Sequence, residues 1–181
     1  LTAEIAQRLE ARGRAVEAIY MGGVFPFARP VKGLMGRWAR LTRIERLRSD
    51  RAEINWLTAL GADLSDLDDE QKAFVIRNMR HDAREAEDYF TRLIDSGVER
   101  LSAPIISVVG EYDPATDYYE ERFREWEFLT STTALVVLDE GGHYFLKYRA
   151  EELAAAVTTT HRNLTAPRPP RPRSGPHRPV A

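Results

Sequence analysis

Two short apolar runs, each followed at once by a loop with a chemically reactive side chain, constrain this chain more than any other feature. Residues 104–109 read PIISVV and lead into Asp113, and residues 134–138 read ALVVL and lead into His143. Runs of this length and β-branched content, separated by a polar helical segment, predict two parallel, buried strands of a βαβ unit. Active sites form at the carboxyl ends of such strands, so we expect Asp113 and His143 at one edge of the sheet. A histidine oriented by an aspartate is the base half of a nucleophilic triad.

The composition excludes several classes of function. The 181 residues are 43% hydrophobic and 30% charged, and the formal net charge of −2 gives no reason to expect nucleic acid as a partner. The chain has no cysteine, which excludes disulfides and thiolate chemistry. No apolar run approaches the roughly 18 residues of a membrane span, and no secretory signal precedes the first expected helix. We therefore expect a cytoplasmic protein with one folded core and no membrane partner.

The loops after the two apolar runs resemble those of a known family. The strings Gly-Glu-Tyr-Asp-Pro (residues 110–114) and Gly-Gly-His-Tyr-Phe-Leu (residues 141–146) are similar to the end of α/β-hydrolase thioesterases that serve polyketide and nonribosomal peptide synthetases. The resemblance implies an α/β-hydrolase fold, with a mostly parallel sheet and a helical lid insertion. It also implies hydrolysis of acyl or peptidyl thioesters held on the phosphopantetheine arm of an acyl or peptidyl carrier protein. No cofactor is implied, because ester hydrolysis needs none.

The same resemblance gives the two loop residues their roles. His143 would take a proton from a serine nucleophile and later activate water, while Asp113 would hold the imidazole in the correct tautomer. Some enzymes of the superfamily carry the acid after an earlier strand. Here Gly22 and Gly23 occupy that position without a carboxylate nearby, which leaves Asp113 as the acid.

The nucleophile does not stand out in the sequence. Residues 2–13 resemble the helix that follows the nucleophile turn in these thioesterases, where a Gly-x-Ser-x-Gly elbow comes directly before the helix. None of the seven serines has glycine two positions before it. We therefore expect the nucleophile upstream of Leu1, and we expect this chain to be the C-terminal part of the enzyme, inactive in isolation.

The segment over residues 33–96 is expected to be mostly helical and to form the lid. Within it, apolar side chains recur at spacings of three and four, which is the pattern of amphipathic helices. One helix is expected over residues 52–60. A longer helix is expected to follow, with Ser65 or Asp66 as its N-cap and a break near His81.

Four side chains are candidates for substrate binding. Trp38, Trp56 and Met79 are expected to help line an acyl channel under a mobile lid, and ordinary helix packing is the alternative explanation. Tyr144, which directly follows the expected base, is the fourth candidate.

The expected lid also carries a local stripe of basic residues. Between residues 32 and 51 the acids are Glu45 and Asp50, whereas the basic residues are Lys32, Arg37, Arg40, Arg43, Arg46, Arg48 and Arg51. Carrier proteins are generally acidic around the residue that bears phosphopantetheine, so a basic lid face would steer them toward the enzyme. A solvated helix face is the alternative interpretation.

The remaining segments complete the expected domain. A helix over residues 1–12 would bury Leu1, Ile5, Ala6 and Leu9; the other elements are a strand over 16–21 and helices over 117–128 and 147–157. Residues 1–160 are expected to form the thioesterase domain, and residues 161–181 a disordered, Pro- and Arg-rich tail or linker. The other histidines have no metal-ligand spacing, so no metal site is expected.

Three alternatives stay open on the sequence. In the first alternative, neither residue is catalytic: Asp113 only opens a turn before Pro114, and His143 only caps a loop. The second is a different α/β-hydrolase, an esterase or a macrocycle-forming release domain with the same Asp and His. The third is an inactive fragment that only docks carrier proteins.

Overall fold

The described part of the chain is built on a small parallel sheet. The computed structural model describes residues 1–26, 49–97 and 99–166. In these residues three strands lie in the order β1-β2-β3, and both pairings are parallel. The strands are β1 (Ile19–Gly22), β2 (Ile105–Gly110) and β3 (Thr133–Leu138). The two apolar runs are thus adjacent parallel strands, as predicted.

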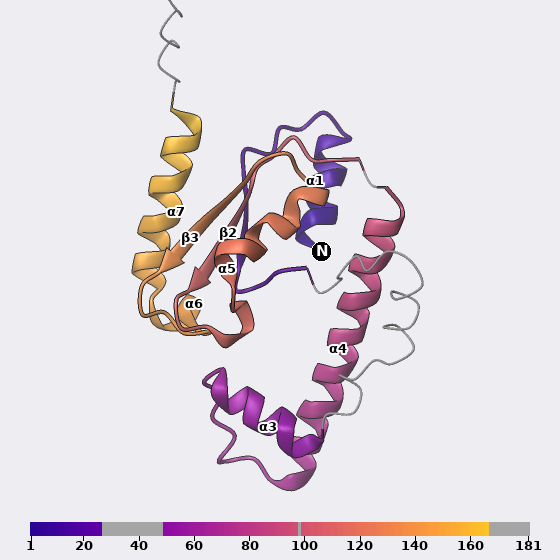
Figure 1. Ribbon diagram of the computed structural model, residues 1–181, viewed down its shortest axis with the longest axis vertical. Helices are drawn as coiled ribbons and strands as arrows, with labels where there is room; N and C mark the ends of the chain where they lie inside the picture. Colours follow the sequence, from indigo (N-terminus) through magenta and orange to yellow (C-terminus); the bar gives the residue numbers. More distant parts are fainter. Residues whose placement is uncertain (27–48, 98, 167–181) are drawn as a thin grey trace, which may run out of the picture.

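Helices lie on both sides of the sheet, with α1 and α7 on opposite sides (Figure 1). The short elements η2 and η3 are 3₁₀ helices. The helices in chain order are α1 (Thr2–Glu10), α3 (Asp50–Ala59), α4 (Asp69–Asp95), η2 (Pro114–Thr116), α5 (Tyr119–Arg122), η3 (Phe123–Phe128), α6 (Phe145–Tyr148) and α7 (Ala150–Thr165). In the described ranges, none of them combines the length and the apolar character that a membrane crossing requires.

Strand β2 lies at the centre of the core because both of its faces are covered. All six of its residues are buried. Ile105 and Val109 belong to a cluster with α1 and with Trp126 of η3, whereas Ile106 and Val108 belong to a cluster with α6 and α7. A strand covered on both faces has to be apolar throughout rather than alternating, and this explains the continuous run that the sequence shows.

Helices α3 and α4 pack against each other and come from the segment between β1 and β2 that is expected to form the lid. Figure 1 shows α3 beyond the carboxyl ends of the strands, with α4 running back beside the sheet. The expected break near His81 is wrong, because α4 is continuous from Asp69 to Asp95. That interval contains neither glycine nor proline, and His81 is simply exposed on the helix surface.

The N-cap of α4 also differs from the expectation. Asp68 caps the helix: its carboxylate accepts from the Gln71 backbone N–H at 2.8 Å, and the Gln71 side chain accepts from the Asp68 N–H at 3.0 Å. This is a capping box, which satisfies two N–H groups reciprocally. Ser65, one of the two expected caps, instead donates its hydroxyl to Asp63 at 2.7 Å.

The expected helix over residues 117–128 is replaced by one turn of α-helix and a 3₁₀ helix. Residues three positions apart lie on one line in a 3₁₀ helix. This winding lines up Phe123, Trp126 and Leu129, which all pack into the α1-side cluster. Trp126, at 1% exposure, is the most buried side chain of this helix.

Smaller differences concern the ends of elements. Helix α1 buries Ala3 and Ala6, whereas Leu1 is 86% and Ile5 48% exposed, so the expected apolar face is rotated. Helix α7 continues to Thr165, past the boundary expected at residue 160.

The carboxyl end of β2 lies so close to the loop after β3 that it has no room for a side chain. Gly110 lies opposite Leu138 at the ends of the two strands. A Cβ added at Gly110 would lie 2.2 Å from the carbonyl oxygen of Gly141, in the loop that follows β3. Glycine at this position is therefore required by the close approach of two backbones rather than by its own φ.

We expect Gly110→Ala to lower the free energy of unfolding by about 1–3 kcal/mol, because the added methyl forces the Gly141 backbone away. Equilibrium unfolding in urea measures this change. Gly142→Ala is the matched control, because a Cβ at Gly142 meets nothing within 4 Å. Equal stabilities for the two variants would contradict the close approach.

Candidate active site

Asp113 is held at the end of β2 by its own local structure. It is the N-cap of η2, and its Oδ1 accepts from the Ala115 backbone N–H at 2.9 Å. Its carbonyl accepts from the Thr116 N–H at 3.0 Å and from the Thr116 hydroxyl at 3.3 Å. Pro114 starts η2, where its missing N–H costs nothing. Asp113 therefore lies in a turn that its sequence neighbours specify.

His143 is delivered by the loop between β3 and α6. This loop is tied to the one after β2 by backbone hydrogen bonds: Glu111 N–H donates to the Leu138 carbonyl at 3.0 Å, and Tyr112 N–H donates to the Gly141 carbonyl at 2.8 Å. Two loops that are distant in the sequence are therefore hydrogen-bonded to each other at the edge of the sheet.

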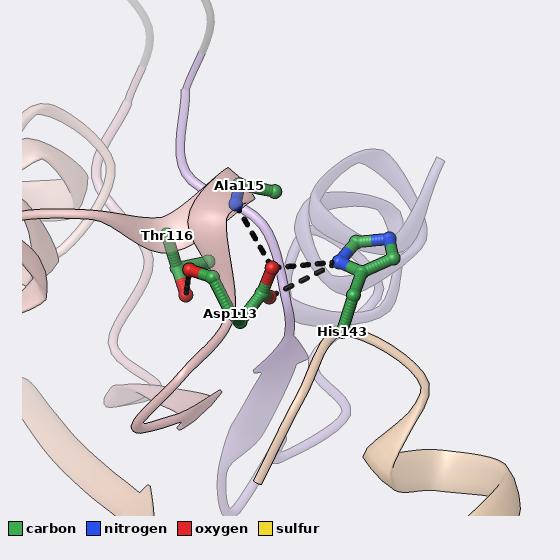
Figure 2. A network of polar contacts seen from close by, with 4 residues as sticks. All are labelled: Asp113, Ala115, Thr116 and His143. Atoms are coloured by element: carbon green, nitrogen blue, oxygen red, sulfur yellow. Dashed lines mark hydrogen bonds and ion pairs between the residues drawn. The ribbon is translucent and has the colours of Figure 1, made fainter. Parts of the chain in front are cut away.

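The structure brings Asp113 and His143 into direct contact (Figure 2). The His143 Nδ1 atom lies 3.0 Å from each carboxylate oxygen of Asp113. The Asp113 side chain is fully buried, whereas the His143 side chain is 28% exposed. A carboxylate that faces Nδ1 favours the tautomer with the proton on Nδ1. Nε2 then carries a free lone pair, and it makes no hydrogen bond within the described residues.

Gly23, just after β1, lies beside this pair. Its φ is +63°, a left-handed conformation that glycine adopts without strain. A Cβ at Gly23 would lie 3.7 Å from Asp113 Oδ2 and 3.8 Å from His143 Cε1. The ends of all three described strands thus converge on one spot. In the sequence, Gly23 is marked only by the Gly22-Gly23 pair, which has no carboxylate nearby.

Tyr144 connects the site to the helical insertion. Its ring meets the His143 imidazole edge-to-face, with centroids 5.3 Å apart. On another side it lies against Gly61, where a Cβ would be 3.5 Å from the Tyr144 ring. Gly61 follows α3 with a φ of +96°. Tyr144 therefore lies between His143 and the loop that joins α3 to α4.

The other three candidates for substrate binding belong to the segment that is expected to form the lid. Trp56 lies in α3 and Met79 in α4, and both are half-buried. Trp38 lies outside the described residues. Within the described residues, the hydrogen-bonding partner of His143 is Asp113 and its ring contact is with Tyr144.

Comparison with known proteins rests on structure. No protein-family model matches the sequence, and a search of curated proteins finds no match either. Among solved structures, ClbQ from the colibactin NRPS/PKS pathway matches with a TM-score of 0.57 and 19% identity, over 89% of this chain and 63% of that one. The type II thioesterase BorB from the borrelidin biosynthetic cluster matches with a TM-score of 0.55 and 25% identity, over 87% of this chain and 59% of that one.

Human thioesterase 2 is also similar, with a TM-score of 0.52 and 17% identity, over 92% of this chain and 69% of that one. The chain thus spans about three fifths of the length of ClbQ and BorB. These likenesses confirm the fold class that the two apolar runs and their loops indicate. The chain has an α/β-hydrolase fold and resembles thioesterases in structure, BorB and human thioesterase 2 among them.

Proposed function

We propose that this chain supplies the acid–base pair of a thioesterase, with His143 as the general base and Asp113 as the residue that orients it. The observation that carries this proposal is the contact of His143 Nδ1 with both oxygens of the buried Asp113 carboxylate at 3.0 Å. The pair lies at the carboxyl ends of two parallel strands, where α/β enzymes place their active sites.

The geometry suits transfer of a proton through Nε2. The partly exposed imidazole accepts a proton from the attacking serine hydroxyl, and the Asp113 carboxylate stabilises the imidazolium that forms. The acyl group then forms an ester with the serine as the thiol leaves with the proton from His143. His143 next takes a proton from the water that attacks the ester, and it gives this proton to the serine oxygen as the ester bond breaks and the carboxylic acid leaves.

The nucleophile in this proposal comes from residues other than the seven serines of the sequence. None of them stands in a Gly-x-Ser-x-Gly elbow, the strained turn that exposes a nucleophilic serine in this fold. Ser107, in the middle of β2, is fully buried and so is inaccessible to a substrate. The acid–base pair therefore acts on a serine supplied by a separate segment.

The substrate site is proposed to lie between His143 and the helical insertion. Tyr144 supports this, because it contacts the imidazole on one side and Gly61 on another. Trp56 and Met79 belong to the two helices of the insertion, and with Trp38 they would line an acyl channel farther from the reacting atoms. The thioester would thus reach His143 past the Tyr144 ring.

The proposed partner is an acyl or peptidyl carrier protein. The support is the likeness to BorB, a type II thioesterase of a biosynthetic cluster, together with the basic stripe over residues 32–51. Most of that stripe lies outside the described residues, and Arg51, in the first turn of α3, is its described member. An acidic carrier and a basic stripe would attract each other at distances of about a Debye length, roughly 8 Å at physiological ionic strength.

The first prediction tests the acid–base pair, in a form of the protein that carries a Gly-x-Ser-x-Gly elbow. His143→Ala should abolish hydrolysis of an acyl thioester, and Asp113→Asn should lower kcat by about 10⁴-fold through the wrong tautomer. Asp117→Asn is the control, because Asp117 is an exposed residue that directly follows η2. Turnover assays, with circular dichroism to verify folding, measure both effects. Equal damage from Asp117→Asn would refute the assignment of Asp113.

The second prediction concerns the 181 residues by themselves. Without an elbow serine they should show no thioesterase turnover, since loss of a triad nucleophile lowers kcat by about six orders of magnitude. A purified sample is assayed with a small acyl thioester, and a sample of His143→Ala serves as the control for contaminating esterases. A robust rate that disappears in the His143→Ala sample would show that the nucleophile lies within these residues.

The third prediction concerns the carrier protein. Changing Arg37, Arg40 and Arg43 together to Glu should slow association with an acidic carrier, and the difference should shrink as salt rises. Stopped-flow association at several salt concentrations measures this. Hydrolysis of a small thioester without a carrier should stay nearly unchanged. Equal losses on carrier-bound and free substrates would instead assign these arginines to folding or to channel shape, and a preference for free esters would favour an ordinary esterase.

A further inference from the structure

The loop that carries His143 begins with a tight turn in an unfavourable conformation. The Gly141 N–H donates to the Leu138 carbonyl at 3.0 Å, which closes a β-turn over residues 138–141. Glu140, the third residue of this turn, has a φ of +55°, whereas Asp139 is outside the left-handed region. A positive φ at the third position alone is the pattern of a type II turn, which favours glycine or asparagine there. Glutamate at this position is strained.

The peptide group between Asp139 and Glu140 is held at both ends by charged side chains. The Glu140 N–H donates to Oε2 of Glu111 at 2.8 Å. The guanidinium of Arg149 donates to the carbonyl of Asp139. Arg149 is aimed by an ion pair with Glu152 at 2.5 Å. The Asp139–Glu140 peptide therefore has the negative Glu111 carboxylate at its N–H and the positive Arg149 guanidinium at its C=O.

This peptide is the one that decides the type of turn. Type I and type II turns differ by a flip of the central peptide plane, and type I needs no positive φ at the third residue. A flip would point the Glu140 N–H away from Glu111 and the Asp139 carbonyl away from Arg149. The two contacts therefore stabilise type II against the type I turn that glutamate would otherwise prefer.

The orientation of this turn is transmitted directly to the base. Gly141 ends the turn, and its carbonyl accepts from Tyr112 N–H at 2.8 Å while it lies against Gly110. Only Gly142 stands between Gly141 and His143. A flipped turn would shift the Gly141 carbonyl, and with it the backbone that presents His143 to Asp113.

We propose that Glu111 and Arg149 are positioning residues, which hold the Asp139–Glu140 peptide in the type II orientation and so set His143 against Asp113. We call these two contacts, from Glu111 and Arg149 to the Asp139–Glu140 peptide, the clamp. An effect of the clamp on catalysis rests on the proposed function, whereas its effect on the geometry of the Asp113–His143 contact does not. Glu111 touches neither reacting atom and acts solely through the backbone of the neighbouring loop.

The test compares four proteins: wild type, Glu111→Ala, the double variant Glu111→Ala with Glu140→Gly, and the control Glu120→Ala. Glu120 is an exposed glutamate in α5 that belongs to neither loop. The principal measurement is the ¹⁵N chemical shifts of the His143 ring nitrogens, which report the nitrogen that carries the proton. The midpoint of urea unfolding is recorded for each protein. In a form that carries the elbow serine, kcat and KM are measured as well.

Wild type and Glu120→Ala should show a proton held on Nδ1. Glu111→Ala should show a mixture of tautomers and a kcat lower by about tenfold with KM unchanged, the scale expected for loss of one hydrogen bond to a charged group. Glu111→Ala with Glu140→Gly should return the ring shifts to those of the wild type and kcat to within about twofold, because glycine adopts the positive φ without a clamp.

Wild-type ring shifts in Glu111→Ala, or a double variant that stays as impaired as Glu111→Ala, would overturn the proposal. If Glu111→Ala fails to fold, the double variant decides: wild-type ring shifts in a folded double variant support the clamp, and any other result overturns it. Absence of turnover in the form that carries the elbow serine and no other substitution would count against the proposed function alone, since the ring shifts are measured without a substrate.

Discussion

The site depends on one constraint: strands β2 and β3 end at residues that are paired with each other. Gly110 and Leu138 are paired at the last position of the two strands, so the loops that follow start side by side. Adjacent residues of a strand are about 3.3 Å apart, and a slip of one residue would carry Asp113 out of hydrogen-bonding distance of His143. The backbone contact between Gly110 and Gly141 and the bonds between the two loops oppose such a slip.

The pair itself is asymmetric in a way that suits proton transfer. Asp113 is buried and its carboxylate is satisfied by the Ala115 N–H and by His143, which a charge without solvent requires. His143 keeps part of its ring exposed. Asp113 is thus fixed by the turn that its own neighbours make, whereas His143 is carried by a loop that starts in a strained turn.

In the described part of the chain, Tyr144 links the site to the helical insertion. Tyr144 contacts the imidazole and the backbone of Gly61, so a movement of α3 relative to the sheet would reach the base through that ring. Gly61 has a positive φ, which lets the chain turn directly after α3 and leaves room for the Tyr144 ring. The position of the His143 ring and that of the loop after α3 are therefore coupled through Tyr144.

Much of this architecture was determined by the sequence alone. Two continuous apolar runs with a reactive residue after each predict parallel buried strands, and parallel strands have to present their carboxyl ends at one edge; Asp113 and His143 follow from that rule. Local chemistry was a weaker guide where several residues could serve: Ser65, Asp66 and Asp68 are all good N-caps, and only Asp68 has a partner at the right spacing.

The tertiary structure decided what depends on residues far apart in the chain. Trp126 is buried and contacts Phe90 of α4 edge-to-face, and the segment that carries it is a 3₁₀ helix rather than the expected α-helix. The role of Glu111 arises from a backbone N–H 29 positions away, and that of Gly61 from a ring beyond β3. No periodicity or motif records such contacts, because they exist only once the sheet has brought the loops together.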